Sequence, residues 1–358
     1  MTDDERFMTR ALELASRPPF TSPNPRVGAV VVRDGVVVGE GSHEGSGTPH
    51  AEVKALEGID AAGATLYVNL EPCIHHGKTP PCAPAVIEAG ISRLVVAIED
   101  PDQRVAGKGI EMLRGAGLEV VVGTCAEAAG DLNRPYLHHR ATARPLVTLK
   151  LALSLDGKLA AADGSSRWIT GEQARRRVHA RRLEVDAILI GAGTVIDDDP
   201  QLTVRDVVAP RQPVRVILDA VGRVPVTRQV FGRGEVIVIT TVSCPHEQKT
   251  RWKSAGAEVV VVPASPDGAV DLEAAIANMG ARGWLEVYCE GGAAVATSLL
   301  REDLVDRLEL NFGPIVIGGD GVGLGSLGIS TIEQAARWRV VHADRMGDDI
   351  VTLLERDR

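Results

Sequence analysis

The first 125 residues alternate between apolar runs of strand length and apolar residues at helical spacing. The helical spacing predicts an amphipathic helix over 5–16, and Asp34-Gly35 is typical of a two-residue hairpin turn. The expected strands cover residues 27–32, 36–39, 66–70, 93–98 and 118–122. Further helices are expected to begin near residue 50 and to cover 83–88 and 107–113. This order predicts a three-layer α/β domain with helices on both faces of a sheet.

A short segment, residues 140–145, precedes a second pattern and predicts two domains, 1–143 and 144–358. The capping-box pattern Thr170-Gly171-Glu172-Gln173 predicts a helix to about residue 183. Asp271 is expected to cap another helix over 272–278. The expected strands cover 146–151, 187–190, 214–218, 236–240, 258–262, 285–289, 308–312, 338–342 and 350–353. The second domain is therefore also α/β, with an antiparallel edge formed by its last strands.

Composition and charge narrow the class of protein. Hydrophobic residues make up 44% of the 358 residues and the net charge is −9, spread without a basic half, which argues against a nucleic-acid partner. No apolar run reaches membrane-spanning length, and the acidic start lacks the apolar core of a signal peptide. The five cysteines, an odd number, fit a reducing cytoplasm. We therefore expect a cytoplasmic protein with a small-molecule partner; a homo-oligomer is compatible with the sequence.

The chemistry of the first domain gathers between residues 50 and 82. His50, Cys73 and Cys82 form a three-ligand set for zinc, which leaves a fourth position open for water. Zinc in such a site lowers the pKa of its water to roughly 7. Glu52 stands beside the ligand as a carboxylate able to move protons. Nucleobase deaminases carry H-x-E and then P-C-x-x-C; the match here is partial, because eight residues separate the cysteines.

The same residues allow two other interpretations. Cys73 and Cys82 could form a disulfide, but nothing in the sequence indicates an oxidising compartment. His75 or His76 could complete a closed structural zinc site, but Glu52 and an open position would then have no purpose.

The path of the chain around the proposed ligands is also predictable. Thr48 can cap a helix and Pro49 can occupy its first position, which would place His50 and Glu52 in the opening turn. Side chains two residues apart do not share a helix face. Their convergence on one site therefore depends on local geometry.

In the second domain, glycines and buried charges mark candidate sites. Gly191-Ala192-Gly193 follows an expected strand, but Ile196 replaces the third glycine of a dinucleotide fingerprint. Glu290-Gly291-Gly292 opens a helix near residue 293, and it could hold a cofactor phosphate or form only a tight turn. Lys150 lies in an apolar strand, where burying a charge is costly, so a functional role is favoured. Arg182 is surrounded by other arginines, and from the residues alone a solvated helix face is the preferred interpretation.

The segment Glu71-Pro72-Cys73-Ile74-His75-His76-Gly77-Lys78-Thr79-Pro80-Pro81-Cys82, with His50-Ala51-Glu52-Val53 before it, closely resembles the bifunctional riboflavin-biosynthesis deaminase/reductase. The blocks 154–158 and 198–203 also fit this family, and the resemblance covers nearly the whole chain. It implies a cytidine-deaminase-like N-terminal domain and a dihydrofolate-reductase-like C-terminal domain. One zinc per chain and NADPH would be the cofactors.

The resemblance also implies a reaction sequence. The first step would deaminate a diaminopyrimidinone that carries a ribosylamino 5′-phosphate, with Glu52 as the proton-transfer group. The second would use NADPH to reduce the ribosyl group to ribityl, giving 5-amino-6-(5-phosphoribitylamino)uracil, with Lys150 as a catalytic residue.

Site residues follow from the same resemblance. The deaminase pocket would be lined by Asn24, His43, His76, Lys78 and Asp100. Residue 102 is Asp where the family commonly has Asn. The reductase substrate would contact Ser166, Arg182, Leu202, Arg205 and Glu290. The cofactor would be held by Ala152, Trp168, Thr194, Asp198, Gly292, Ala293, Ala294, Val295, Ala296, Thr297 and Ser298.

Two alternatives belong to other functional classes. The first is a free-nucleoside or tRNA deaminase with an unrelated appended domain, and the charge distribution opposes the tRNA version. The second is a binding or assembly module whose second half serves dimerisation, and NADPH binding would exclude it.

Overall fold

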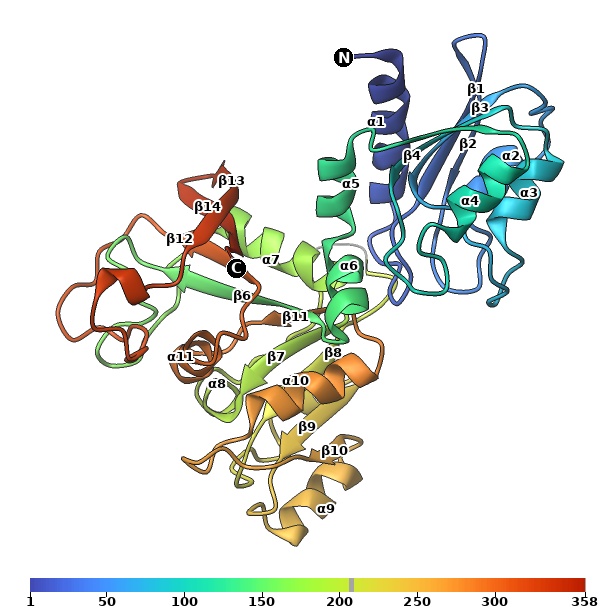
Figure 1. Cartoon of the computed structure of the whole chain (residues 1–358). Helices are drawn as coiled ribbons and strands as arrows, with labels where there is room; N and C mark the ends of the chain where they lie inside the picture. The colour runs from blue at the N-terminus through green and yellow to red at the C-terminus, as the bar shows by residue number, and fades with distance from the viewer. Residues whose placement is uncertain (206–208, 358) are drawn as a thin grey trace. The chain divides into compact units, whose positions relative to one another are not determined.

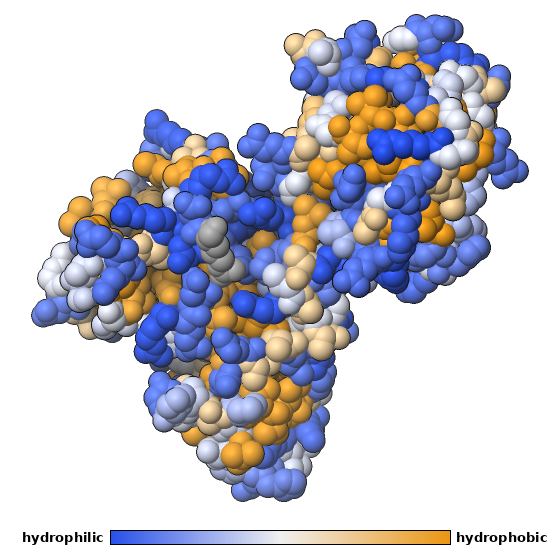
Figure 2. Space-filling view, in the orientation of Figure 1, coloured by the Kyte–Doolittle hydropathy of each residue, from blue (hydrophilic) through white to orange (hydrophobic). Residues whose placement is uncertain are grey.

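The protein was analysed as a computed structural model that describes residues 1–205 and 209–357. The chain divides into two compact units, residues 1–143 and 144–358. Each unit contains its own β-sheet with helices packed on it (Figure 1). None of the helices in the described ranges combines the length and the apolar character needed to cross a bilayer. On the face shown in Figure 2, hydrophilic residues surround scattered groups of hydrophobic ones.

The sheet of the first unit has five strands in the order β2-β1-β3-β4-β5. β1 (Gly28–Arg33) pairs antiparallel with β2 (Val36–Ser42) and with β3 (Thr65–Leu70). β4 (Arg93–Ile98) and β5 (Glu119–Val122) continue the sheet parallel to β3. The antiparallel hairpin comes from the Asp34-Gly35 turn, where both residues have positive φ.

Helices cover both faces of this sheet (Figure 1). α1 (Asp3–Ser16) and α5 (Ala126–Leu132) lie on one face. The other face carries α2 (Ala51–Leu56), α3 (Cys82–Glu88) and α4 (Lys108–Gly115). A last helix, α6 (Arg134–Thr142), follows α5. This arrangement confirms the predicted three-layer α/β fold, although the sequence did not indicate α5 and α6.

Two glycines of β2 allow α2 to lie directly against the sheet. A Cβ at Gly41 would overlap the backbone carbonyl oxygen of Ala51, and one at Gly39 would overlap that of Ala55. Small residues at such positions permit close approach of two backbones. The start of α2, which carries the candidate catalytic carboxylate, is therefore fixed by contact with β2.

The sheet of the second unit has nine strands in the order β10-β9-β8-β7-β11-β6-β12-β14-β13. Its parallel part consists of β6 (Leu146–Leu153), β7 (Ala187–Gly191), β8 (Val214–Leu218), β9 (Val236–Thr240), β10 (Glu258–Val261), β11 (Glu286–Cys289) and β12 (Arg307–Phe312). β14 (Asp349–Arg356) and β13 (Trp338–Met346) extend it antiparallel. This confirms the predicted antiparallel edge.

The helices of the second unit join these strands. They are α7 (Glu172–Glu184), α8 (Ala192–Asp198), α9 (His246–Ser254), α10 (Leu272–Ala281) and α11 (Ala293–Arg301). Asp271 caps α10 by accepting from the Ala274 N–H at 2.9 Å, as predicted. β11 enters the sheet between β6 and β7, which brings the residue after it, Glu290, beside the middle of β6.

Two predicted helix starts are wrong in detail. His50 is the N-cap of α2 with an extended backbone, and the Thr48 hydroxyl donates to the Gly45 carbonyl oxygen rather than capping the helix. α7 is capped by Gly171 and not by Thr170; the Gly171 N–H donates to Asp349 Oδ2 at 2.6 Å. In the second case a carboxylate from β14 supplies the acceptor, which no local pattern could reveal.

Candidate active sites

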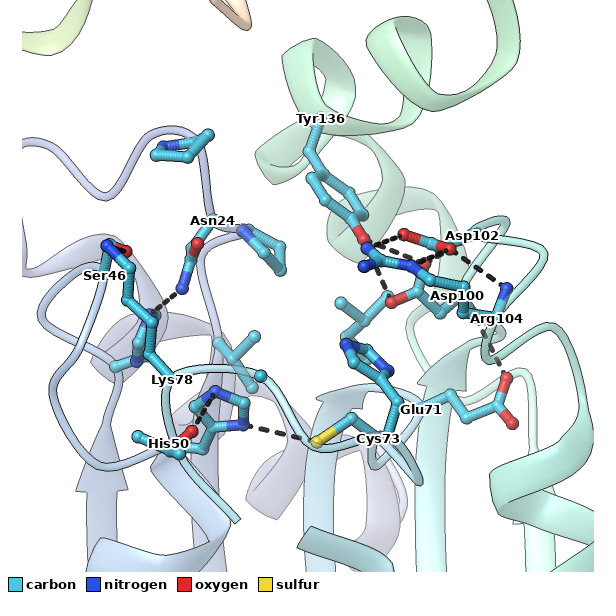
Figure 3. Close-up of a pocket in the computed structure, with 18 of the residues that line it drawn as sticks. Asn24, Ser46, His50, Glu71, Cys73, Lys78, Asp100, Asp102, Arg104 and Tyr136 are labelled. Carbon is cyan, nitrogen blue, oxygen red and sulfur yellow. Dashed lines mark hydrogen bonds and ion pairs between the residues drawn. The ribbon is translucent and has the colours of Figure 1, made fainter. Parts of the chain in front are cut away.

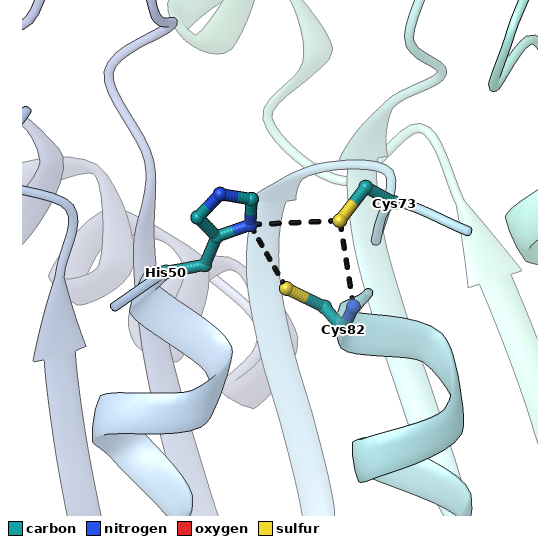
Figure 4. A group of neighbouring side chains, drawn as sticks. All are labelled: His50, Cys73 and Cys82. Carbon is teal, nitrogen blue, oxygen red and sulfur yellow. Dashed lines mark hydrogen bonds between the residues drawn. The ribbon is translucent and has the colours of Figure 1, made fainter. Parts of the chain in front are cut away.

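Three side chains from distant elements meet in the first unit as a candidate metal centre (Figure 4). His50 Nδ1 lies 3.1 Å from Cys82 Sγ and 3.5 Å from Cys73 Sγ, and the three ligand atoms lie within 4.8 Å of one another. His50 precedes α2, Cys73 follows β3, and Cys82 is the first residue of α3. Because His50 stands outside the helix in extended backbone, it can face the same point as Glu52.

The surroundings of Cys73 and His50 favour the thiolate form of the cysteine and a ring orientation of the histidine that suit metal binding. Hydrogen bonds from the Cys82 thiol, from His50 and from the Cys82 backbone N–H, at 3.4 Å, lower the pKa of Cys73 to about 4. A thiolate is the form that binds metal. His50 Nε2 lies 3.2 Å from the Thr79 hydroxyl, which holds the ring so that Nδ1 faces the two sulfurs.

Glu52 completes the centre as a buried carboxylate. Its side chain is 3% exposed, and burial raises its pKa to about 7. Among the described residues, no partner reaches Glu52 Oε2. One imidazole and two thiols are a donor set that zinc prefers, and the unpartnered Glu52 oxygen suits a water bound there. The residues present therefore fit a zinc ion with an open position.

The candidate metal centre lies in a cavity of about 280 Å³ (Figure 3). Asn24, Ser46 and Lys78 are on one side of it, and Asp100, Asp102, Arg104 and Tyr136 on the other. Of the predicted pocket residues, Asn24, His43, Lys78 and Asp100 line the cavity. His76 does not line it and is exposed; His75 lines the cavity instead, and its buried Nδ1 has no hydrogen-bond partner among the described residues.

Asn24 and His43 form one wall of this cavity. Burial lowers the pKa of His43 and keeps the ring neutral. His43 Nδ1 therefore donates to the Pro49 carbonyl oxygen at 3.3 Å, and Nε2 accepts from Asn24 Nδ2 at 2.8 Å. The His43 ring also packs edge-on against His50, with ring centroids 5.1 Å apart. This network fixes both polar side chains before any ligand binds.

The opposite wall depends on two residues that the sequence analysis missed. The Tyr136 hydroxyl, from α6, lies 3.0 and 3.1 Å from the two carboxylate oxygens of Asp100. Glu71 accepts backbone N–H bonds from Asp100, Gly107, Gly109 and Ile110, at 2.8 to 3.2 Å. Glu71 is part of the Glu71-Pro72-Cys73 motif, so its position in the sequence could have indicated a role at the site. No sequence pattern pointed to Tyr136, and the helix that carries it was not predicted.

Asp102 and two arginines lie at the same wall. Arg104 Nε and Nη2 donate to the two carboxylate oxygens of Asp102 at 2.9 and 2.6 Å, and Arg140 Nε is 3.7 Å from Oδ2. Hydrogen bonds from Arg104 lower the pKa of Asp102 to about 2. Asp102 is therefore charged at neutral pH and holds Arg104 at the cavity.

The second unit holds a larger cavity, of about 720 Å³. It brings together the following predicted residues: Lys150, Ala152, Ser166, Trp168, Arg182, Thr194, Asp198, Leu202, Arg205, Glu290 and Gly292. The rest of the predicted cofactor segment lies in α11 and is absent from the lining of this cavity: Ala293, Ala294, Val295, Ala296, Thr297 and Ser298.

α11 instead supports this cavity. Val295 packs where a Cβ at Gly191 or Gly291 would stand, and the Thr297 hydroxyl bonds within its own helix and accepts from Gly325 N–H. Only the N-cap of the helix, Gly292, reaches the cavity, and its N–H donates to Thr194 Oγ1 at 3.0 Å.

Arg182 occupies a buried position instead of a solvated helix face. Its guanidinium forms a fork on Glu290, with Nε–Oε1 of 2.6 Å and Nη2–Oε2 of 2.8 Å, and Nη1 donates to the Thr203 carbonyl oxygen at 2.9 Å. Both side chains are about one-tenth exposed. The fork is thus already filled by a carboxylate, which fixes Glu290 beside Lys150.

At the rim of the same cavity, the Trp168 side chain is 66% exposed and the guanidinium of Arg175 stacks on its ring at 4.4 Å. Arg205 is exposed. A Cβ at Gly292 would come within 3.2 Å of Thr194 Oγ1, so this turn is shaped by glycine. A stacking surface, exposed cations and the start of a helix fit a nucleotide cofactor.

Comparison with known proteins finds a matching family for each of the two units. The family described as RibD C-terminal domain matches residues 145–352, and that described as cytidine and deoxycytidylate deaminase zinc-binding region matches residues 1–98. The riboflavin biosynthesis protein RibD of Aquifex aeolicus is 43% identical over 99% of this chain and 98% of its own length. The chain belongs to the RibD family.

Further RibD relatives support the assignment. RibD of Escherichia coli is 40% identical, covering 97% of this chain and 98% of the relative. The structure of Acinetobacter baumannii RibD superposes with a TM-score of 0.90 at 37% identity, covering 99% of both chains. A Thermotoga maritima diaminohydroxyphosphoribosylaminopyrimidine deaminase/5-amino-6-(5-phosphoribosylamino)uracil reductase gives 0.85 at 36% identity, also covering 99% of both.

The protein is therefore a bifunctional enzyme of riboflavin biosynthesis, with a zinc-binding deaminase domain and a reductase domain. The predicted cytidine-deaminase-like and dihydrofolate-reductase-like folds and the predicted pair of activities are confirmed. Membership of this family implies zinc and a nicotinamide cofactor.

Proposed function

We propose that the first unit deaminates a diaminopyrimidinone ribosylamino 5′-phosphate and that the second reduces the ribosyl group of the product with NADPH. The T. maritima relative is described as acting on these two compounds. The observation that carries the proposal is the unpartnered, buried Glu52 oxygen beside a His-Cys-Cys donor set, since it gives the first cavity a proton-transfer group at a metal site.

In the first cavity, zinc held by His50, Cys73 and Cys82 would supply an acidified water as the nucleophile. Glu52 would accept one proton from the attacking water and pass it to the ring nitrogen. It would then accept the second proton of that water, from the new hydroxyl on the ring carbon, and pass it to the amine, which leaves as ammonia. Burial of Glu52 keeps bulk water from competing for these protons.

The remaining lining residues orient the substrate. Asn24 and His43 are preset by their mutual hydrogen bond and face the pyrimidine, and Asp100, held by Tyr136, faces the ribose hydroxyls. Lys78, whose Nζ donates to the Ser46 hydroxyl at 3.0 Å, supplies positive charge for the phosphate. We assign His75 the contact first expected of His76, since its buried Nδ1 lacks a partner among the described residues.

In the second cavity, bound NADPH would be the source of the hydride that reduces the first carbon of the opened ribose. Reduction also consumes one proton, and the Lys150 ammonium at the cavity floor supplies it. Arg182 acts through Glu290, whose carboxylate it orients, while Arg205 and Ser166 at the rim face the substrate phosphate. Trp168, Thr194, Asp198 and the Gly292 N–H line the space for the cofactor.

The test is to incubate the purified protein with the diaminopyrimidine nucleotide, with and without NADPH, and to identify the products by mass. Deaminated ribosylamino compound should accumulate without NADPH, and ribitylamino compound should form with it. In the Glu52→Gln variant ammonia release should stop while reduction of supplied deaminated substrate continues. In Lys150→Met the pattern should reverse. Loss of both activities in either folded variant would contradict two separate sites.

We also infer that residues 1–143 and 144–358 can each act alone, because each has its own sheet and core. A chain truncated to residues 144–358 should oxidise NADPH with the deaminated substrate and leave the diamino compound unchanged. Failure of this folded fragment to reduce the deaminated substrate would show that the reductase needs the first unit.

A further inference from the structure

Lys150 lies between two carboxylates in a row across three neighbouring parallel strands. It pairs in register with Glu309 of β12, and Glu290 extends the adjacent β11, whose Cys289 pairs with Leu149. Residues in register on adjacent strands project to the same face, with backbones about 4.8 Å apart. The ammonium therefore has one carboxylate on each side.

The two carboxylates differ in how much of their charge is already neutralised. Glu290 is held by both fork nitrogens of Arg182. Glu309 Oε1 accepts the Tyr288 hydroxyl at 2.7 Å, and its Oε2 is 4.0 Å from Arg181 Nε. The hydrogen bonds of Arg181 go to Glu184 and Glu286. Glu309 is 3% exposed and is not held by a guanidinium fork, and its charge raises the pKa of Lys150 together with that of Glu290.

We propose that Glu309 is a positioning residue of the reductase, which holds Lys150 in its ammonium form and fixes it at the floor of the cavity. The role assigned to Lys150 rests on the proposed function. Glu309 itself is buried, is absent from the lining of the cavity, and acts through its neighbour. Tyr288 orients the carboxylate by its hydroxyl hydrogen bond, and burial raises the pKa of Tyr288, so that this hydroxyl keeps its proton.

Electrostatics supports this role. Burial lowers the pKa of Lys150, whereas Glu290 and Glu309 raise it and Arg182 lowers it further. Arg181, which pairs with Glu286, lies 4.0 Å from Glu309. The other charged or titratable groups of the cavity lining are Arg167, Glu172, Arg175, Arg176, His179, Asp198, Asp199 and Arg205. Because Lys150 lies between Glu290 and Glu309, removing the charge of Glu309 should release the proton of Lys150 at lower pH. Loss of one nearby opposite charge shifts a pKa by about one to three units.

The experiment compares Glu309→Gln with Glu286→Gln in the full chain. Glu286 is a similarly buried carboxylate of the same sheet that also contacts Arg181. It accepts a hydrogen bond from the hydroxyl of Thr148, two residues before Lys150, and therefore serves as the matched control. The first readout is the titration of Lys150 in the protein without ligands, followed by NMR of ¹³C-labelled lysine and assigned with Lys150→Met. The second is the pH profile of NADPH oxidation with the deaminated substrate, with ammonia release as control.

In Glu309→Gln, the Lys150 titration and the basic limb of kcat should both move to lower pH by about one unit or more, and ammonia release should be unchanged. Glu309→Asp should restore most of the shift. Glu286→Gln should lower thermal stability and leave the Lys150 titration within a few tenths of a unit. An unmoved titration in Glu309→Gln, or equal shifts in both glutamine variants, overturns the proposal.

Should Glu309→Gln not fold, the double variant Tyr288→Phe/Glu309→Leu removes the same charge together with its hydroxyl partner, which leaves no buried polar group unpaired. The same downward shift is expected, and its absence overturns the proposal. Undiminished reduction by Lys150→Met would instead refute the catalytic role of Lys150, and the NMR titration would still decide whether Glu309 controls its proton.

Discussion

The two cavities are built on opposite plans. In the first, the groups proposed to do the chemistry come from one stretch, residues 50–82, and the fold brings the ends of this stretch together. In the second, Lys150 lies in β6, Arg182 in α7 and Glu290 directly after β11, and the Arg182–Glu290 ion pair joins residues 108 positions apart. A site whose residues are close in sequence can be predicted from their spacing, whereas the second site can be predicted only when the order of the strands in the sheet is known.

The cavities also differ in how they balance charge. In the first, two thiols, an imidazole and a carboxylate converge, and Glu52 Oε2 has no hydrogen-bond partner among the described residues. In the second, each of three cations faces a carboxylate of the protein. The pairs are Arg182 with Glu290, Arg181 with Glu286 and Lys150 with Glu309. Loss of metal should therefore abolish only the deaminase activity, and loss of a charged side chain should destabilise the second unit.

Cys73→Ser is the strongest test of that contrast. A hydroxyl is a poor substitute for a thiolate ligand, so the variant should lose most of its zinc and nearly all ammonia release. Reduction of supplied deaminated substrate should remain at the wild-type rate. Zinc content is measured by mass spectrometry on the same preparation as the two activities. Full retention of zinc would contradict the ligand assignment.

Glu52→Gln separates the carboxylate from the metal. The amide keeps size and hydrogen bonding but cannot accept a proton, so deamination should fall by about two orders of magnitude or more. Zinc content should stay near that of the wild type, since Glu52 is not a ligand. Ammonia release at a near-normal rate would refute its role in proton transfer.

Arg182→Met probes the charge pairs of the second cavity. It leaves the Glu290 carboxylate buried without its fork, which should cost about 3–5 kcal/mol in the free energy of unfolding of the second unit. The matched control is Arg176→Met, which breaks an exposed pair with Glu172 and should cost about 0–1 kcal/mol. Urea unfolding measures both. Equal costs would show that burial of the Arg182–Glu290 pair has no energetic consequence.

Asp102→Asn should have the smallest effect. The folded pKa of Asp102, about 2, lies below its usual 3.8, so the charged form stabilises the fold above pH 3.8 and this contribution is lost as the pH falls towards 2. Because Arg104 is largely exposed, the variant should lose at most about 1 kcal/mol at neutral pH, and its stability should depend less on acid. A fall in ammonia release beyond tenfold would give Asp102 a direct part in deamination.

Particular residues show where sequence reasoning ends. The strands and the proposed zinc ligands were predicted from apolar runs and motif spacing, and the lining residues were predicted from the resemblance to a known family. His75 and His76 are adjacent and chemically identical, so only the loop geometry decides which one faces the cavity. The N–H of Gly171, the N-cap of α7, donates to Asp349 of β14, 178 residues away. The burial of Arg182 depends on β11 entering beside β6, which no local pattern encodes.

The glycines of β2 have a practical consequence for anyone redesigning the deaminase. Val36, Val37 and Val38 are exposed on this edge strand and should tolerate a varied library. Gly39 and Gly41 are in the same strand, yet any side chain there would displace α2 and with it Glu52. A shift of about 1 Å in a catalytic group can reduce a rate by two orders of magnitude. In a saturation library of this strand, most substitutions at residues 36–38 should therefore keep deaminase activity, and most substitutions at Gly39 and Gly41 should abolish it.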